Sequence, residues 1–213
     1  VRILNKITNE VDFKLSLSII ILAAGQGKRM HSDKPKVLNL LAGKPLLTHV
    51  YETAMKIEHR DIYIVYGCGG EQVKNTLKNS KVCWVKQEEQ LGIGHAVQQV
   101  LPNIPKSDDI LILYGDVPLI SEASLIKLVK AATDSGFSLL TAYFDEPYGY
   151  GRIVRDGDDN VTAIVEEKDA TVEQQNICEV NAGFMVISAE ILNLQIDSIK
   201  NKNKQNEYYL TDM

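Results

Sequence analysis

Apolar residues along the chain occur in two alternating patterns. Nearly continuous apolar runs over residues 17–22, 61–66 and 109–114 have the length and β-branched content of strands that are buried on both faces. Between the first two runs, apolar residues at 46, 50, 54 and 57 recur at the spacing of a helix. This alternation predicts an α/β fold that is Rossmann-like and three-layered, with a mixed, mostly parallel sheet and helices on both faces.

The remaining segments add elements to this prediction. Strands are also expected over residues 82–86, 138–144 and 179–187, and helices over residues 71–77, 94–101, 121–134 and 188–194. Residues 149–154 and 161–166, separated by a polar segment, predict a β-ribbon in place of another crossover unit. We expect this ribbon to cover the crevice at the carboxyl ends of the parallel strands. Residues 38–45 are predicted to form a short turn, and residues 200–206 a flexible loop.

Length and composition favour one large domain. With 213 residues and 45% hydrophobic side chains, the chain can bury a substantial core. We assign residues 1–16 to an N-terminal extension and residues 17–213 to the domain. The formal net charge of −5 argues against nucleic-acid binding, which needs a broad basic face.

Cysteine content and hydropathy predict a cytoplasmic protein without a membrane partner. Cys68, Cys83 and Cys178 form no C-x-x-C pair, so they indicate neither a disulfide framework nor a zinc site, and we expect them to be buried. No apolar run reaches the roughly 18 residues of a membrane span. Charges within residues 1–16 argue against the apolar core of a signal peptide.

The first apolar run stops at a glycine-containing loop, residues 23–27 (Ala-Ala-Gly-Gln-Gly). Small residues let successive N–H groups turn toward one point, which is how a backbone forms a concavity for phosphate oxygens. Although the whole chain is acidic, four cations then follow within nine residues: Lys28, Arg29, Lys34 and Lys36. This local reversal of charge predicts an anionic ligand.

Neither common phosphate-loop motif accounts for this stretch. The sequence contains no G-x-x-x-x-G-K-[ST], and Met30 occupies the position of the third glycine in G-x-G-x-x-G. A strand-to-loop turn with a solvated basic face therefore stays an alternative at this point.

A second loop precedes a helix at residues 87–96. Gly92 and Gly94 direct backbone donors at a ligand near the helix N-terminus. Gln87 and Gln90 carry donors and acceptors that suit the edge of a planar base, and a solvated polar loop is the alternative. His95 has no carboxylate adjacent in sequence, so we expect a capping or packing role for it ahead of a catalytic one.

Two acidic residues follow predicted strands. Asp116 comes after the run 109–114, at the end of a strand where open α/β sheets bind ligands. Because Mg²⁺ takes one or two protein carboxylates together with substrate phosphates, Asp116 is the predicted metal ligand. The alternative is that Asp116 caps the next helix, a role that Ser121 already fills. Glu166 ends another strand, a position from which a carboxylate can reach a sugar hydroxyl, and a charged surface run over residues 166–169 is the alternative.

Several segments together resemble the sugar-phosphate nucleotidylyltransferases. Residues 22–30 (LAAGQGKRM), followed by Pro35-Lys36, resemble the L-x-x-G-x-G-[TK]-R-M…P-K signature of that class. Further segments are similar to the uridylyltransferase domain of the bifunctional GlmU family: QxxQLGxGHA at 87–96, YGDVPL at 114–119, GYGRI at 149–153, IVExKDA at 164–170, NxG at 181–183 and EYYLTD at 207–212. The resemblance covers residues 17–213.

This resemblance implies the nucleotide-diphospho-sugar transferase fold. It also implies a Mg²⁺-dependent reaction of UTP with N-acetylglucosamine 1-phosphate, giving UDP-N-acetylglucosamine and pyrophosphate for cell-envelope synthesis. By motif, catalytic roles fall on Arg29, Lys36 and Asp116, of which Asp116 would bind the metal. Substrate-binding roles fall on Leu22, Ala23, Ala24, Gly25, Lys36, Gln87, Gly92, Ile93, Tyr114, Gly115, Asp116, Gly151, Glu166 and Asn181. Gln87 and Gly92 would read uracil, and Tyr114, Gly151, Glu166 and Asn181 would contact the sugar.

Three departures from the family pattern bear on activity. Ile93 stands where the family usually has Thr, and Lys28 replaces the commoner Thr. The sequence ends at Met213, before the family's second metal ligand, an Asn, and before the helical arm and the acetyltransferase β-helix on which family trimers rely. From the resemblance we expect a domain truncated at its C-terminal end, whose nucleotide binding outlasts its catalysis. A non-catalytic nucleotide-binding remnant and a transferase for another base are the alternatives, and the oligomeric state stays open.

Overall fold

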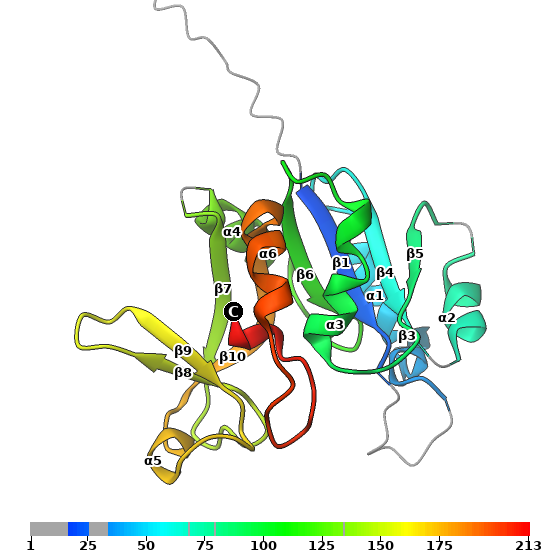
Figure 1. Cartoon of the computed structure of the whole chain (residues 1–213). Helices are drawn as coiled ribbons and strands as arrows, with labels where there is room; N and C mark the ends of the chain where they lie inside the picture. The colour runs from blue at the N-terminus through cyan, green and yellow to red at the C-terminus, as the bar shows by residue number, and fades with distance from the viewer. Residues whose placement is uncertain (1–16, 26–33, 68, 79, 134) are drawn as a thin grey trace, which may run out of the picture.

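The structure is a computed structural model that describes residues 17–25, 34–67, 69–78, 80–133 and 135–213 (Figure 1). Its strands are β1 (Leu17–Ala23), β2 (Leu40–Leu41), β3 (Lys44–Pro45), β4 (Ile62–Tyr66), β5 (Cys83–Lys86), β6 (Asp109–Tyr114), β7 (Phe137–Tyr143), β8 (Arg152–Arg155), β9 (Val161–Val165) and β10 (Glu179–Ser188). Its helices are α1 (Leu46–Ala54), α2 (Gly70–Thr76), α3 (Ile93–Gln98), α4 (Glu122–Ala132), α5 (Val172–Gln175) and α6 (Ala189–Gln195), with short 3₁₀ turns at Lys36–Leu38, Leu101–Asn103, Ile196–Ser198 and Leu210–Asp212.

An eight-stranded mixed sheet forms the centre of the molecule, in the order β5-β4-β1-β6-β10-β8-β9, with β7 paired to β10. Strands β5, β4, β1 and β6 are parallel. The central strand β1 is buried along its whole length, as its continuous apolar run predicts. The mixed sheet of the predicted fold is thereby confirmed.

Helices cover both faces of the sheet, so the predicted three layers are also confirmed. Side chains of β1 alternate between two apolar clusters, because successive residues of a strand point to opposite faces. Ile19 and Ile21 pack on the side of α1, α2 and α4. Ile20 and Leu22 pack on the side of α3 and α6, which lie in front of the sheet in Figure 1.

Strand β10 divides the sheet into two regions. Its second half pairs antiparallel with β6, and its first half contacts β8 at Val180 and Arg152. Its pairing with β7 shifts register between Asn181 and Met185. A bulge of this kind bends a strand and re-aims its side chains. The antiparallel ribbon β8–β9, predicted from the sequence, therefore diverges from the parallel strands beyond this point.

Most boundaries agree with the sequence patterns, with local exceptions. The predicted cap at Ser121 is present, since Ser121 Oγ accepts from Ser124 N at 3.1 Å. Ser188 likewise caps α6, with its Oγ accepting from Ile191 N at 3.2 Å. Helix α1 ends at Ala54 instead of residue 57. Residues 38–45 form the small hairpin β2–β3 together with the end of a 3₁₀ turn. The sequence patterns did not predict α5, a single turn held by a capping box at Thr171.

The prediction that the cysteines are buried is wrong for the two that the structure describes. Cys83 and Cys178 are both exposed. Cys83 lies on β5, the outer strand of the parallel region, and Cys178 precedes β10 in a connecting segment. Cys68, residues 1–16, Lys28 and Arg29 lie outside the described residues.

Candidate functional site

The carboxyl ends of β1 and β6 lie side by side and bring the start of the glycine-containing loop next to the segment that carries Asp116. Leu22 is in register with Tyr114, and Gly115 N donates to Leu22 O at 2.9 Å. A Cβ on Gly115 would lie 3.1 Å from that carbonyl, so the close approach favours glycine. Gly25 and Asp116 therefore extend from the same edge of the sheet, as expected.

Lys36 and Asp116 form an ion pair at this edge, with Lys36 Nζ 2.6 Å from Asp116 Oδ2. The Asp116 side chain is 24% exposed and that of Lys36 is 47% exposed. The pair is thus open enough to meet a ligand. Asp116 does not cap α4, because Ser121 does so.

The position of Lys36 is set by the residue before it. Pro35 is buried, and its ring packs against Gly69 at the start of α2, where a Cβ would lie 2.8 Å from Pro35 Cγ. Gly69 has φ +76°, which glycine adopts readily. This contact fixes where the 3₁₀ turn Lys36–Leu38 begins and brings its first side chain to Asp116.

Gln87, predicted to contact a base, follows β5 and is 3% exposed, so the alternative of a solvated polar residue does not hold for Gln87 itself. Its amide Nε2 donates to Gly92 O at 3.1 Å and contacts His95 Nδ1 at 3.1 Å. Gly92 has φ +110°, and a Cβ there would lie 2.7 Å from Tyr208 O. Ile93 begins α3 and packs against the apolar cluster under that helix.

Residues predicted to contact a sugar lie where β10 leaves β6. A Cβ on Gly183 would lie 2.6 Å from the Tyr114 ring, and Gly183 has φ +86°. Asn181 Oδ1 accepts from Gly183 N at 2.8 Å, and Asn181 N donates to Gly151 O at 2.8 Å. Tyr114, Gly151 and Asn181 therefore surround the bulge of β10. Burial raises the pKa of the Tyr114 hydroxyl.

Glu166 follows β9 and faces the C-terminal segment. Thr211 Oγ1 donates to Glu166 Oε1 at 3.1 Å. Burial raises the pKa of the Glu166 carboxyl, although the Thr211 hydrogen bond opposes this. A Cβ on Gly151 would lie 3.3 Å from Glu166 Oε1, so the two predicted sugar contacts are neighbours. A cavity of about 500 Å³ lies between β9 and the C-terminal segment and includes Glu166 and Thr211 in its lining.

A second cavity, of about 620 Å³, lies between the β2–β3 hairpin and α2. Its lining contains none of the predicted site residues. The site is therefore assigned from the strand ends and their contacts, and this other cavity has no part in it.

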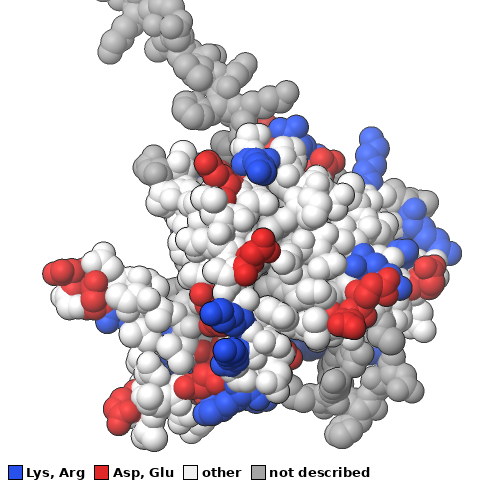
Figure 2. All heavy atoms as spheres, in the orientation of Figure 1, with Lys and Arg blue, Asp and Glu red and all other residues white. Residues whose placement is uncertain are grey.

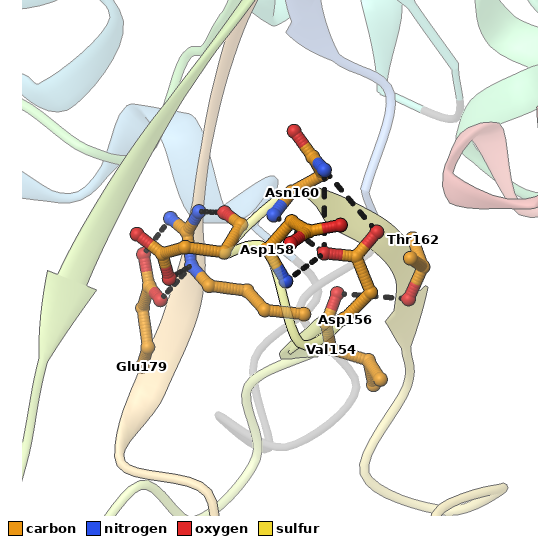
Figure 3. A network of polar contacts seen from close by, with 8 residues as sticks. Val154, Asp156, Asp158, Asn160, Thr162 and Glu179 are labelled. Atoms are coloured by element: carbon orange, nitrogen blue, oxygen red, sulfur yellow. Dashed lines mark hydrogen bonds and ion pairs between the residues drawn. The ribbon is translucent and has the colours of Figure 1, made fainter.

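Ion pairs hold the ribbon that carries Gly151 and Glu166. Arg152, 1% exposed, lies 2.6 Å from Glu167 Oε2 and donates to the Tyr150 and Gln175 carbonyls. At the other end of β8, Arg155 donates two hydrogen bonds to the Glu179 carboxylate, each 2.8 Å long (Figure 3). Hydrogen bonds from Arg155 lower the pKa of Glu179 from 4.5 to about 2.

The outer turn of the ribbon is acidic. Figure 2 shows Asp and Glu side chains at the ribbon's outer end, and the turn contains Asp156, Asp158 and Asp159. Asp156 Oδ1 accepts from Asp158 N at 3.0 Å and from Asn160 N at 2.9 Å, so its carboxylate organises the turn (Figure 3). These bonds lower the pKa of Asp156. The Asp156 carboxylate thus stabilises the turn itself.

The site has two regions, a parallel half and a ribbon half. The parallel half comprises the ends of β1, β4, β5 and β6 with Lys36, Asp116 and residues 87–96. The ribbon half comprises Gly151, β8, β9, the first half of β10, Glu166 and, from the end of β6, the Tyr114 side chain, whose ring faces Gly183. Tyr208 N donates to Leu91 O at 2.7 Å, whereas Thr211 bonds Glu166, so residues 208–211 contact both halves.

Several residues that shape the site carry no strong local signal. Gly67 is one, since a Cβ there would lie 2.5 Å from Gln90 Nε2 and 2.9 Å from Ala24 O. Tyr208 and Thr211 lie in the EYYLTD segment, which the resemblance singled out without giving it a role. Arg152 and Glu167 are separated in sequence, so pattern alone does not pair them.

No group of three or more His, Cys, Asp or Glu side chains in the described part of the chain is placed to hold a metal. Within the same residues, no helix is long and apolar enough to cross a membrane.

Comparison with known proteins assigns the chain to a family. Residues 19–167 match the MobA-like NTP transferase domain. The bifunctional protein GlmU of Idiomarina loihiensis is 48% identical over 199 residues, which is 93% of this chain and 44% of that protein. The chain thus spans less than half the length of this curated relative.

Solved structures share the fold at low identity. A UDP-glucose pyrophosphorylase complexed with UDP-glucose has a TM-score of 0.74 at 19% identity, covering 92% of this chain and 84% of its own. A putative glucose-1-phosphate thymidylyltransferase from Bacillus anthracis has a TM-score of 0.69 at 18% identity, covering 84% of this chain and 74% of its own. With a family match over more than half of its length, the chain belongs to the MobA-like NTP transferase domain family.

Proposed function

We propose that this domain transfers the uridylyl group of UTP to N-acetylglucosamine 1-phosphate, giving UDP-N-acetylglucosamine and pyrophosphate. The observation that carries the proposal is the Lys36–Asp116 pair at the joined ends of β1 and β6, directly beside the small-residue loop. Further support comes from the family match, the motifs shared with the GlmU family and the 48% identical relative.

The parallel half binds the nucleotide in this proposal. Backbone groups of residues 22–25 line the nucleotide, and Gln87 and Gly92 contact the uracil. Lys36 and Arg29 hold the triphosphate and then the departing pyrophosphate. Cations suit this place because negative charge builds up on the leaving group in the transition state.

The ribbon half binds the sugar phosphate. Tyr114, Gly151, Glu166 and Asn181 surround the bulge of β10 and offer a hydroxyl, a backbone group, a carboxylate and an amide. This set of donors and acceptors suits a sugar with several hydroxyls and an acetamido group. Gly115 and Ile93 contribute through their backbone at the ends of β6 and the second loop.

A divalent cation fits the position of Asp116. The carboxylate lies at the strand end where phosphates are expected, and Mg²⁺ needs few protein oxygens when phosphates supply others. We propose Mg²⁺ with Asp116 as the protein ligand; when bound, it would neutralise phosphate charge. Lys36, at 2.6 Å from Asp116, supplies a second positive charge at the same place.

The chemical step requires positioning more than a protein base. A phosphate oxygen of the sugar phosphate attacks the α-phosphorus of UTP, and the bond from that phosphorus to the bridging oxygen of pyrophosphate breaks. The nucleophile is already an anion, so no residue has to remove a proton from it. The protein's part is to align the two substrates and to place Lys36 and Arg29 near the growing charge.

Pyrophosphate release with UTP, N-acetylglucosamine 1-phosphate and Mg²⁺ tests this function. We expect release that requires both substrates, and a loss of about a hundred- to a thousandfold in Lys36→Met and in Asp116→Asn. Lys56→Met, at a lysine that lies 3.7 Å from Glu122 and is not among the predicted site residues, is the matched control and should keep the parental rate.

Equal rates in all four proteins would contradict the roles of Lys36 and Asp116. Release with CTP or GTP but not with UTP would favour a transferase for another base. A protein that neither binds UTP nor releases pyrophosphate would contradict the proposed function. Cytoplasmic location and the lack of a nucleic-acid or membrane partner stay predictions.

A further inference from the structure

The side-chain amide of Gln87 is held by two neighbours at once. Its Nε2 atom lies 3.1 Å from Gly92 O and 3.1 Å from His95 Nδ1. The residue is 3% exposed and directly follows β5, where its own N–H donates to Tyr66 O at 2.8 Å. Both ends of the residue are therefore fixed.

These contacts determine which end of the amide each neighbour meets. A carbonyl oxygen can only accept a hydrogen bond, so the atom facing Gly92 O must be the NH₂ group. Its second N–H points to His95 Nδ1, which must then be the unprotonated ring nitrogen. Both amide hydrogens are thereby used, and Oε1 is the amide's remaining hydrogen-bonding atom.

Packing around His95 fixes its ring. His95 lies in the first turn of α3, and its ring is tilted over that of Tyr208 with centroids 6.4 Å apart. Gly94 N donates to Tyr208 O at 2.8 Å, which ties the same turn to the C-terminal segment. The ring nitrogen that faces Gln87 is thus held by the fold itself.

We propose that His95 is a specificity-determining positioning residue, which holds Gln87 so that its Oε1 accepts a hydrogen bond from a pyrimidine N3–H. This inference rests on the proposed function. Uracil carries a proton on N3, whereas N3 of cytosine is an acceptor and would face Oε1 without a hydrogen between them. Sites built around such a bond discriminate strongly against an analogue that leaves a buried polar group unpaired.

Affinities for UTP and CTP, measured by titration calorimetry with Mg²⁺, test this role. His95→Phe keeps a ring but removes the acceptor, so the ratio of the two affinities should fall about tenfold, the value of one hydrogen bond. His95→Asn places Oδ1 where Nδ1 stands and should keep the ratio within about threefold. The matched control is His49→Phe, a half-buried histidine bound to Leu41 O at 2.9 Å outside the site, which should leave the ratio unchanged.

An unchanged ratio in His95→Phe, with the parent protein preferring UTP, would overturn the inference while leaving the proposed function intact. Absence of UTP binding in the parent would instead count against the proposed function. A second measurement needs no variant. The ¹⁵N spectrum of the unliganded protein should show His95 protonated on Nε2 alone, and a proton on Nδ1 would also overturn the inference.

Discussion

The parallel half of the site is built on an apolar core, whereas the ribbon half depends on charged and polar contacts. In the parallel half, strands β1, β4 and β6 are largely buried, and the predicted site positions are mostly backbone groups, glycines and one ion pair. In the ribbon half, β9 is largely exposed, and the buried groups that hold it include Arg152 and Glu179. The stability of the parallel half should therefore depend little on charged side chains, whereas the stability of the ribbon half should depend strongly on them.

Gly183→Ala is expected to have the largest effect on stability. The substitution forces a side chain into φ +86° and places Cβ 2.6 Å from the Tyr114 ring. Backbone strain and overpacking together should cost about 3 kcal/mol in the free energy of unfolding, measured by urea denaturation. Gly149→Ala separates the two terms, because φ is +82° there and nothing lies within 4 Å. It should cost about 1 kcal/mol. Equal losses of unfolding free energy in the two variants would show that overpacking against Tyr114 adds nothing to the cost of Gly183→Ala.

Arg152→Met should cost about 2 to 3 kcal/mol of unfolding free energy, because removing one partner leaves Glu167 as an uncompensated charge. This loss is smaller than the cost usually seen on breaking a fully buried ion pair, because the Glu167 side chain is 28% exposed. Removing that charge as well, in the double variant Arg152→Met with Glu167→Gln, should recover part of the loss. A double variant less stable than the single one would contradict this account of the ribbon.

Acid should weaken the ribbon half through Glu179. Its pKa in the folded protein is about 2, below the ordinary 4.5, because Arg155 binds the carboxylate. The pair therefore stabilises the fold above about pH 4.5, and this stability is lost as the pH falls toward 2. In Arg155→Met, urea midpoints measured between pH 5 and pH 2.5 should fall less steeply than in the parent. If the urea midpoints of the two proteins fell equally steeply with pH, the Arg155–Glu179 pair would not be the source of this loss of stability.

The smallest effect is expected for Lys44→Met on the other side of the molecule. Lys44 pairs with Glu52 at 2.7 Å, but the two side chains are 41% and 50% exposed. Exposed pairs contribute little, so the change in unfolding free energy should stay within about 0.5 kcal/mol. A loss as large as that of Arg152→Met would mean that burial does not set how much an ion pair contributes to the stability of this protein.

The parallel half could be predicted from the sequence in more detail than the ribbon half. Strands β1, β4 and β6 are buried on both faces. A strand buried on both faces has a nearly continuous apolar sequence, which can be recognised directly. Asp116 could be placed because it follows such a run directly. Cys83 was assigned wrongly because the outer position of β5 in the sheet is not visible in a run of apolar residues.

Features of the ribbon half depend on contacts between distant residues. The register shift in β10 and the Arg152–Glu167 pair arise from tertiary packing, which periodicity does not encode. Contacts of residues 208–211 with both halves are likewise non-local. Helix α5 is a single turn, too short for a helical repeat to appear, although its capping box at Thr171 is a local signal that was available.

The division of the site into a nucleotide-binding parallel half and a sugar-binding ribbon half is tested most directly by titrating UTP and UDP-N-acetylglucosamine into the parent protein and into Gly183→Ala. The added Cβ would lie 2.6 Å from the Tyr114 ring, and the nearest atoms around it all belong to Tyr114, none to Gln87, Lys36 or Asp116. We predict that UTP affinity stays within about threefold while UDP-N-acetylglucosamine binds at least about tenfold more weakly, as expected when one well-placed contact is lost. Equal loss for both ligands in a folded variant, or no loss for either, would contradict the division.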